Sequence, residues 1–560
     1  MLERLRTSFG TSLFLARVLR ETGIFAPGQR IRHLPAFAAA ARHAALGPPM
    51  VLLFHGLTQP DREAVVEYGE RGVRRLRWGE FNTAINRVCN ALLERGAGAG
   101  ARVALMLPNG IEYLLAHTAL ARLGATAVLI GYRSKPAEIA HILGNAQPRA
   151  TILHGRFLES VQQARADVGD ASPMLVVDGD ELPGALPAPL TDWERALAAA
   201  SPELPRQRRA KDDDGGGMII YTSGTTGKPK GATRNWKQTG LDSVADLVQR
   251  AGVRADERHL TVCPLYHSAA PAFVALTLAL GGTVVLMNHF DPEGALAIIE
   301  KEAITSSLMV PTMLVRLAAL PETTRARYNP SSLRWLMSGA APLATETARQ
   351  IQEQLGPILW NFYGSTETGL VTAAGPEDHL SRPGTIGRAL RGNEIRLYGE
   401  DGQPVPTGEV GELYARNSTM IAGYHRNQQA TQDATRDGLF SVGDLARMDA
   451  DGYYYLESRK HDMVISGGVN IYPREIEDLL HAHPAILEAA VIGVPDPEWG
   501  ERLKAFLVLR PGAKLTAEEV SDYCRASLAD FKRPREVAFV DELPRNPTGK
   551  VLKRTLRERP

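Results

Sequence analysis

Residues 221–231 combine the residue types that hold a phosphate group. They follow the apolar run 218–220 and read YTSGTTGKPKG. The glycines let the backbone turn tightly and bring its N–H groups onto a phosphate, and the hydroxyls and lysines add donors and positive charge. The pattern differs from the strand, GxxxxGK[ST] and helix of a P-loop, so it does not favour a nucleotide-hydrolysing motor. It predicts a triphosphate-binding loop, whose contact residues are Thr222, Ser223, Gly224, Thr225, Thr226, Gly227 and Lys228.

Three later segments carry further polar and glycine-rich motifs. Residues 361–369 read NFYGSTETG, residues 438–444 read GLFSVGD, and residues 544–550 read PRNPTGK. Together with residues 221–231 they resemble, in the same order, the signature motifs of the adenylate-forming (ANL) superfamily. That superfamily contains acyl-CoA synthetases, firefly luciferases and the adenylation domains of peptide synthetases. The chain is most similar in type to AMP-forming synthetases of medium- and long-chain fatty acyl-CoA.

The resemblance implies a nucleotide site built from these motifs. Tyr363 is expected to stack on adenine, and Asn361 can read the amino edge of the base. Asp444 and Arg459 resemble the pair that holds the ribose hydroxyls, an acceptor beside a donor fork. The residues expected around the adenine are Gly339, Ala340, Ala341, Asn361, Tyr363 and Gly364.

The implied chemistry is attack of a carboxylate on the α-phosphate of ATP. Two anions repel each other, and phosphorus gathers further negative charge in the transition state. Lys550 matches the family lysine that touches both the carboxylate and the α-phosphate, and Thr366 can donate to the nascent phosphate. Glu367 is the expected ligand of Mg²⁺, which prefers hard oxygen donors.

The second half-reaction requires a rearrangement, because the thiol of coenzyme A must approach from the side that Lys550 occupies. In the family the small domain swings at a hinge that here is His461, where many relatives carry Asp or Lys. A histidine could make the hinge pH-sensitive, but a neutral substitution is the favoured interpretation. Residues 466–477 resemble the loop that lines the pantetheine tunnel, in which Gly468 leaves room for the thiol arm or is a simple turn glycine.

The acid-binding part is expected from residues 264–270, PLYHSAA. His267 matches a residue that lines and gates the acyl pocket in the family, and a structural histidine is the alternative. Small or apolar residues surround it in sequence or follow further on: Ala269, Ala270, Ala272, Phe273, Val274, Met309, Met313 and Leu314. A pocket made of them suits an alkyl chain. A medium- or long-chain fatty acid is therefore expected, with aryl and bile-type acids left open.

The cofactors implied by the resemblance are ATP, Mg²⁺ and coenzyme A. One alternative is an adenylate-forming enzyme with another acceptor or fate, such as a carrier protein, a β-lactone or an oxidation. Another class of protein, a non-catalytic nucleotide-binding protein, is disfavoured because Lys550 and Glu367 are both present.

Alternating strand-like and helical stretches must position these residues. Residues 102–107, 111–123 and 126–130 read as strand, helix and strand, and residues 333–337, 345–355 and 358–362 repeat the cycle. This alternation predicts an α/β fold with a largely parallel sheet. We expect an N-terminal extension (1–50), an adenylation domain of layered α/β subdomains with a small β-barrel-like subdomain (51–460), and a mobile α+β domain (461–560).

Composition is that of an ordinary soluble globular protein. The formal net charge is +1 over 560 residues, so no basic excess favours nucleic acid. The widely spaced Cys89, Cys263 and Cys524 indicate neither a disulfide framework nor a zinc site. A cytoplasmic location is expected. The first residues of the chain are either a basic amphipathic helix at a membrane surface or a helix packed on its own domain. A transit peptide is a weaker third interpretation, because Glu3 and Glu21 are acidic. The sequence leaves the oligomeric state open, a homodimer included.

Overall fold

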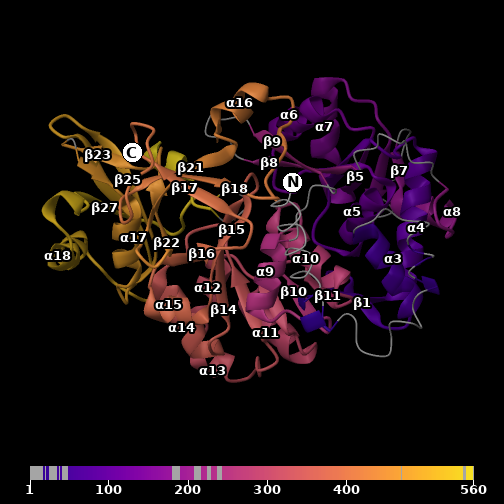
Figure 1. The fold of residues 1–560 in the computed structure, drawn as a ribbon, viewed down its shortest axis with the longest axis horizontal. Coiled ribbons are helices and arrows are strands. Elements are labelled where there is room, and N and C mark those ends of the chain that lie inside the picture. The colour runs from indigo at the N-terminus through magenta and orange to yellow at the C-terminus, as the bar shows by residue number, and fades with distance from the viewer. Residues whose placement is uncertain are drawn as a thin grey trace, which may run out of the picture. The chain divides into compact units, whose positions relative to one another are not determined.

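The strand-like and helical runs form the expected kinds of element in the computed structural model (Figure 1). It describes residues 17–18, 20–23, 35–36, 38, 40, 48–178, 190–206, 216–222, 229–235, 242–467, 469–545 and 550–558. The chain divides into two compact units. The first unit comprises Met1–Leu308, Tyr328–Arg334 and Ser418–Asp433, and the second comprises Met309–Arg327, Trp335–Asn417 and Ala434–Pro560.

One sheet of the first unit has the strand order β19-β9-β8-β4-β3-β5-β6-β7. Strands β8, β4, β3, β5, β6 and β7 pair in parallel, whereas β9 and β19 are antiparallel, so the sheet is mixed. The strand bounds are β3 (Arg102–Met106), β4 (Thr126–Leu129), β5 (Ala150–His154), β6 (Met174–Val177), β7 (Leu190–Asp192), β8 (Gly217–Thr222), β9 (Lys230–Asn235) and β19 (Gly423–Tyr424).

The helices α6 (Pro136–Ala146) and α7 (Leu158–Val168) lie side by side and share a core with this sheet (Figure 1). Ile139 and Leu143 of α6 and Val161 of α7 are buried there together with Ala104 and Val128 of the strands. The expected strand, helix and strand of residues 102–130 are confirmed as β3, α5 (Ile111–Leu123) and β4.

A second sheet of the first unit runs β2-β1-β11-β10-β12. Its strands are β1 (Glu63–Gly69), β2 (Gly72–Arg77), β10 (Arg258–Thr261), β11 (Thr283–Met287) and β12 (Ser306–Leu308). The remaining helices of this unit are α3 (Pro48–Thr58), α4 (Trp78–Glu94), η1 (Gly155–Phe157), α8 (Trp193–Ala199), α9 (Asp242–Ala251), α10 (Ala269–Ala279), α11 (Pro292–Lys301) and α16 (Gln428–Asp433).

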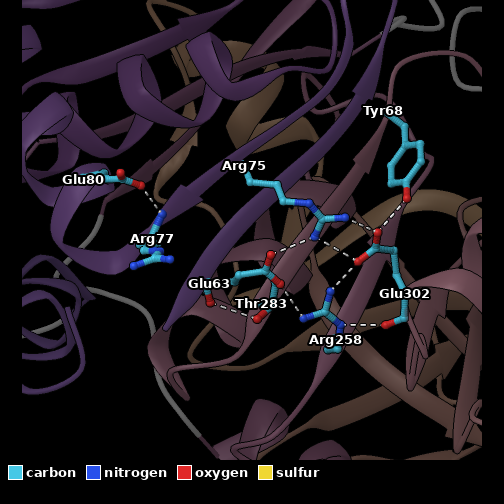
Figure 2. Close-up of polar contacts among 8 residues, drawn as sticks. All are labelled: Glu63, Tyr68, Arg75, Arg77, Glu80, Arg258, Thr283 and Glu302. Carbon is cyan, nitrogen blue, oxygen red and sulfur yellow. Dashed lines mark hydrogen bonds and ion pairs between the residues drawn. The ribbon is translucent and has the colours of Figure 1, made fainter. Parts of the chain in front are cut away.

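An ion-pair network fastens the β1–β2 hairpin to β10 and to the end of α11 (Figure 2). Arg75 pairs with Glu63 at 2.7 Å and with Glu302 at 2.5 Å. Arg258 pairs with the same two carboxylates at 3.0 and 2.6 Å. Tyr68 donates to Glu302 at 2.6 Å, and burial together with this bond raises the tyrosine pKa to about 12. The balanced charges fix the hairpin without leaving a buried ion unpaired.

The second unit begins with a sheet in the order β13-β14-β15-β16-β22-β21-β18-β17, to which β20 adds beside β21. Only β13 and β14 are parallel among these pairs. The strands are β13 (Trp335–Ser338), β14 (Leu359–Ser365), β15 (Gly369–Ala374), β16 (Thr385–Ala389), β17 (Glu394–Tyr398), β18 (Gly411–Arg416), β20 (Thr435–Arg436), β21 (Leu439–Met448) and β22 (Tyr454–Arg459). The helices are α12 (Pro311–Ala318), α13 (Glu322–Arg325), α14 (Thr345–Leu355) and α15 (Pro376–Ser381).

The C-terminal part of the second unit has its own sheet, β24-β23-β26-β25 with β27 beside β26. Alternate residues of β25 and β26 face opposite sides: Val491 and Ala505 join the core under α17, and Ile492 and Phe506 join the core with Leu556 of α19. The elements are β23 (Val464–Ser466), β24 (Val469–Ile471), α17 (Pro473–His481), β25 (Ile486–Asp496), β26 (Gly500–Leu509), α18 (Ala517–Ser527), η4 (Asp530–Lys532), β27 (Glu536–Phe539) and α19 (Lys553–Arg557). The expected fold class, a large N-terminal α/β part with a smaller C-terminal α+β domain, is confirmed.

The predicted N-terminal amphipathic helix lies mostly outside the described residues. Of its C-terminal end, Val18 is buried, and Glu21 pairs with Arg17 at 2.7 Å and accepts a hydrogen bond from Gln249 of α9 at 2.9 Å. This end therefore packs on its own unit. No helix within the described ranges is long and apolar enough to span a bilayer, and contact of residues 1–20 with a membrane surface stays a prediction.

Candidate active site

The predicted phosphate loop connects the two strands of the β8–β9 hairpin. Thr222 and Lys230 face each other in the ladder, and Tyr221 donates from its hydroxyl to Asn145 at 2.6 Å. The chain thus returns as a strand, unlike a P-loop, in which a helix follows. Of the predicted contact residues only Thr222 is described; residues 223–228 lie outside the described ranges.

The turn between β14 and β15 carries the predicted phosphate and metal residues. The Ser365 hydroxyl accepts from the backbone N–H groups of Glu367 and Thr368 at 3.1 and 3.0 Å, and the Thr368 hydroxyl accepts from the Ser365 N–H at 3.1 Å. These reciprocal bonds fix a tight turn. Glu367 is only 6% exposed, and Thr366 is half-buried. A single shielded carboxylate suits Mg²⁺, which is commonly held by one or two carboxylates together with substrate phosphates.

The residues predicted to hold adenine and ribose lie together in the second unit. Tyr363 is buried on β14, and its hydroxyl donates to Asp444 on β21 at 2.8 Å. Arg459 on β22 faces Asp444 in the strand ladder and pairs with it at 3.1 Å. Burial, and next the Asp444 charge, raises the pKa of Tyr363 well above its usual value. The tyrosine therefore stays a proton donor, and Asp444 keeps further lone pairs for ribose hydroxyls.

The segment after β13 approaches β14 closely. A Cβ added to Gly339 would lie 2.6 Å from the Phe362 ring, and a Cβ on Gly364 would lie 1.9 Å from the Gly369 carbonyl oxygen. Ala340 has a positive φ of 68°, a conformation that side-chain-bearing residues rarely adopt. Ala341 follows directly, and Asn361, 5% exposed, lies between β13 and β15. Backbone strain and lack of space here fit a surface shaped for a flat ring.

Lys550 lies near the Asp444–Arg459 pair. The side chain is half-buried, and it interacts electrostatically with Arg459, Asp444, Asp462 and Lys553. Burial, and next the Arg459 charge, lowers the lysine pKa to about 7, although both carboxylates oppose the shift. The structure therefore brings the predicted catalytic cation to the predicted ribose site.

The predicted hinge is fastened on its C-terminal side. Arg557 of α19 donates to the His461 carbonyl oxygen at 3.3 Å and to the Asp462 carboxylate at 3.2 Å. Burial is the main cause that lowers the His461 pKa. Gly468 lies outside the described residues, while its neighbour Gly467 has a φ of 58° and lies under the Trp499 ring.

The predicted acid-binding segment leads from β10 to α10. His267 is half-buried, and its ring centroid lies 4.1 Å from that of Tyr266. The predicted apolar residues of α10 face different ways: Ala272 is exposed, whereas Phe273 is buried and stacks on His259 of β10 with ring centroids 6.0 Å apart. Phe273 therefore belongs to the core of the first unit.

Two residues that contact this segment were missed by sequence reasoning. Asn109, in the β3–α5 connection, hydrogen-bonds the backbone of Leu265 and of the preceding Cys263. Tyr113, in the first turn of α5, donates to the Leu265 carbonyl oxygen. A usable signal existed, because Asn109 lies in the loop after the parallel strand β3, where ligand-binding loops gather.

Comparison with known proteins identifies the family. Residues 55–425 match the AMP-binding enzyme family, and residues 475–550 match the AMP-binding enzyme C-terminal domain. The chain belongs to the AMP-binding enzyme family. It is 36% identical to a feruloyl-CoA synthase of Amycolatopsis sp., over 86% of this chain and 94% of that protein. It is 31% identical to a long-chain-fatty-acid–CoA ligase of Mycobacterium tuberculosis, over 86% of this chain and 93% of that protein.

A solved structure agrees with these relatives. The anthranilate CoA ligase AuaEII in complex with anthranoyl-AMP superimposes with a TM-score of 0.82 and 26% identity, covering 93% of this chain and 98% of that one. This AMP-binding enzyme is an ATP-dependent, AMP-forming acid–CoA ligase, and its cofactors are ATP, Mg²⁺ and coenzyme A. In this chain Tyr363, Asp444 and Arg459 form a donor and acceptor set that fits a nucleoside, and Glu367 fits the metal.

Proposed function

We propose that this ligase activates a hydrophobic monocarboxylic acid, with medium- and long-chain fatty acids as the first candidates. The observation that carries the catalytic scheme is the position of Lys550 beside Asp444 and Arg459 in one unit. A lysine there supplies positive charge next to the nucleotide, where charge on the α-phosphate grows during carboxylate attack.

Each residue has a separate task in this scheme. The carboxylate oxygen attacks the α-phosphate and diphosphate leaves, while Lys550 and Thr366 balance the charge on the phosphorus oxygens. Asp444 and Arg459 orient the ribose. Glu367 would hold Mg²⁺, which would screen the phosphate charges when bound. In the second step the thiol attacks the acyl carbonyl, its proton is released, and AMP leaves. His461 is the proposed hinge between the steps.

The fatty-acid proposal is supported by the residue types of the expected pocket. Ala269 and Ala270 leave space, Met313 and Leu314 are apolar, and none of them offers a charge to a polar acid. The similarity to a long-chain-fatty-acid–CoA ligase supports the same choice.

Aryl acids are the second candidate. The feruloyl-CoA synthase among the relatives and the anthranoyl-AMP bound to the AuaEII structure both concern aromatic acids. His267, just before α10, is half-buried and packs against Tyr266, and its ring offers a surface on which an aromatic acid could stack.

The test measures AMP and diphosphate release from MgATP with fatty, cinnamic-type, benzoic and amino acids, each with and without coenzyme A. Turnover that requires both coenzyme A and a fatty acid of at least medium length supports the first candidate. A kcat/KM at least tenfold higher for an aryl acid than for the fatty acids would instead support aryl acids as the substrate class. Adenylate that accumulates regardless of coenzyme A contradicts the ligase scheme.

A further inference from the structure

Three side-chain hydrogen bonds from Asn109 and Tyr113, the bracket, hold the backbone of residues 263–265 where the predicted acid-binding segment begins. Asn109 makes two of them. It lies in the connection between β3, which ends at Met106, and α5, and it is 3% exposed. The side-chain amide donates to the Cys263 carbonyl oxygen at 3.0 Å, and its oxygen accepts from the Leu265 N–H at 2.9 Å. The amide thus pairs with two backbone groups as a neighbouring strand would, at a place where the chain has left β10.

Tyr113 adds a third bond to the same stretch. It lies in the first turn of α5, is 1% exposed, and donates from its hydroxyl to the Leu265 carbonyl oxygen at 2.7 Å. Burial raises its pKa far above the usual value, so the hydroxyl keeps its proton at any ordinary pH. Both polar groups of the Leu265 backbone are therefore held by side chains, one from the β3–α5 connection and one from the start of α5.

The start of α5, beside Asn109 and Tyr113, is anchored by a hydrogen bond and by ion pairs. Glu67 of β1 accepts from the Ile111 N–H at the start of α5 at 3.2 Å and pairs with Arg74 of β2. Arg74 also pairs with Glu112 at 2.6 Å. The start of α5 is thereby fixed to the β1–β2 hairpin, so Asn109 and Tyr113 present their polar atoms from an immobile frame.

The bracketed backbone is followed by Tyr266 and by His267, which is predicted to line the acid pocket. Tyr266 packs edge-on against Tyr132 with ring centroids 5.0 Å apart, and a Cβ on Gly131 would lie 3.1 Å from the Tyr266 ring. The His267 N–H donates to the Pro264 carbonyl oxygen at 3.2 Å, which closes a turn. Movement of the Leu265 peptide would carry both aromatic side chains with it.

We propose that Asn109 and Tyr113 are positioning residues for acid selection: they hold residues 263–265 so that Tyr266 and His267 present one fixed surface to the acid. The inference rests on the proposed role of this segment in acid binding. It implies that loss of these hydrogen bonds changes the KM for the acid and leaves the KM for ATP unchanged, because the predicted nucleotide residues lie on other elements.

The test compares Asn109→Ala and Tyr113→Phe with Asn86→Ala. Asn86 is a matched control, since it is 5% exposed and bonds the Pro202 carbonyl oxygen and Arg122 at the other end of α5. Each lost buried hydrogen bond should raise the acid KM about fivefold. We expect a rise of about fivefold for Tyr113→Phe and about 25-fold for Asn109→Ala, with the ATP KM within about twofold of wild type. Asn86→Ala should lower Tm without moving the acid KM.

Amide hydrogen exchange supplies a readout that does not need activity. In Asn109→Ala, peptides that cover residues 262–268 should exchange faster, whereas in Asn86→Ala they should keep wild-type protection. Unchanged exchange in Asn109→Ala, or equal rises of acid and ATP KM, would overturn the inference. If wild type activates no hydrophobic acid while the exchange difference is found, the proposed substrate class fails and the bracket stands.

Discussion

The side chain of Lys550 shows how a catalytic charge is tuned by its neighbours. Arg459 and Lys553 disfavour its ammonium form, Asp444 and Asp462 favour it, and burial decides the balance. With a pKa near 7 the free lysine holds its proton only part of the time at neutral pH. A polyanionic nucleotide would restore the proton, so charge arrives together with the substrate.

Proton uptake on ATP binding follows from this pKa. At pH 8 most of the free Lys550 is neutral, and bound phosphates should raise its pKa, so binding should take up close to one proton. At pH 5.5 the lysine is already charged and the uptake should vanish. Calorimetry in buffers of different ionisation enthalpy measures the number of protons. Lys550→Met should abolish the uptake, and an uptake unchanged in that variant would contradict the assignment.

Replacement of Lys550 should affect the two half-reactions differently. Lys550→Met should slow adenylate formation about 100- to 1,000-fold, the usual loss for one transition-state charge or donor. Thioester formation from supplied acyl-AMP should stay within a few-fold of wild type. Lys553→Met is the matched control, because Lys553 is paired with Glu477 at 2.7 Å. Equal slowing of both half-reactions in Lys550→Met would refute its role.

At the scale of elements, close approaches between strands and loops shape the adenine site. The loop after β13 passes the Phe362 ring so closely that Gly339 has no room for a side chain. Phe362 is flanked on β14 by Asn361 and Tyr363, so any displacement of its ring shifts both predicted nucleotide residues. Packing between elements therefore sets the positions of the predicted adenine residues.

Gly339→Ala should act through that ring. The new methyl group would overlap Phe362 and should cost about 1–3 kcal/mol of unfolding free energy. The ATP KM should rise about tenfold, and the acid KM should change less. Kinetics and thermal unfolding of the double variant Gly339→Ala/Phe362→Leu provide the check. Recovery of the ATP KM in the double variant is expected, and no recovery would place the cause elsewhere.

At the scale of the whole molecule, the hinge must permit one movement and exclude others. Arg557 binds the carbonyl oxygen of His461 and the side chain of Asp462, so the peptide after His461 is tied to α19. This tie leaves the backbone dihedrals of His461 as the natural place of rotation between the two half-reactions. The bounds 51–460 and 461–560 for the moving parts stay a prediction.

His461→Pro tests the hinge. A proline fixes φ and should impede rotation, so diphosphate release should persist while thioester formation slows at least about tenfold. His461→Ala should behave like wild type in both steps, because the histidine is interpreted as a substitution without functional effect. Rapid-quench measurement of adenylate and thioester separates the steps. Wild-type thioester formation in His461→Pro would move the hinge to another residue.

Local pattern in the sequence was enough to predict much of the molecule. Strand, helix and strand at residues 102–130 were predicted because hydrophobic periodicity reflects local backbone geometry. Tyr363, Asp444 and Arg459 were assigned to one nucleotide site from motifs alone, and the structure brings them within hydrogen-bonding distance. Motif residues can be assigned without knowledge of the fold, since the reaction requires particular residue types.

Tertiary structure alone decided the remainder. The bond from Asn109 to Cys263 joins residues 154 positions apart, and no spacing rule predicts a contact of that range. Phe273, expected in a pocket, packs on His259 because the orientation of α10 on its sheet depends on packing with distant strands. The pKa of Lys550 depends on burial and on charges about 90 to 110 positions away in sequence. The sequence thus determined which groups are predicted to do the chemistry. Folding determined their proton affinities and their positions, because desolvation and long-range hydrogen bonds exist only in the folded chain.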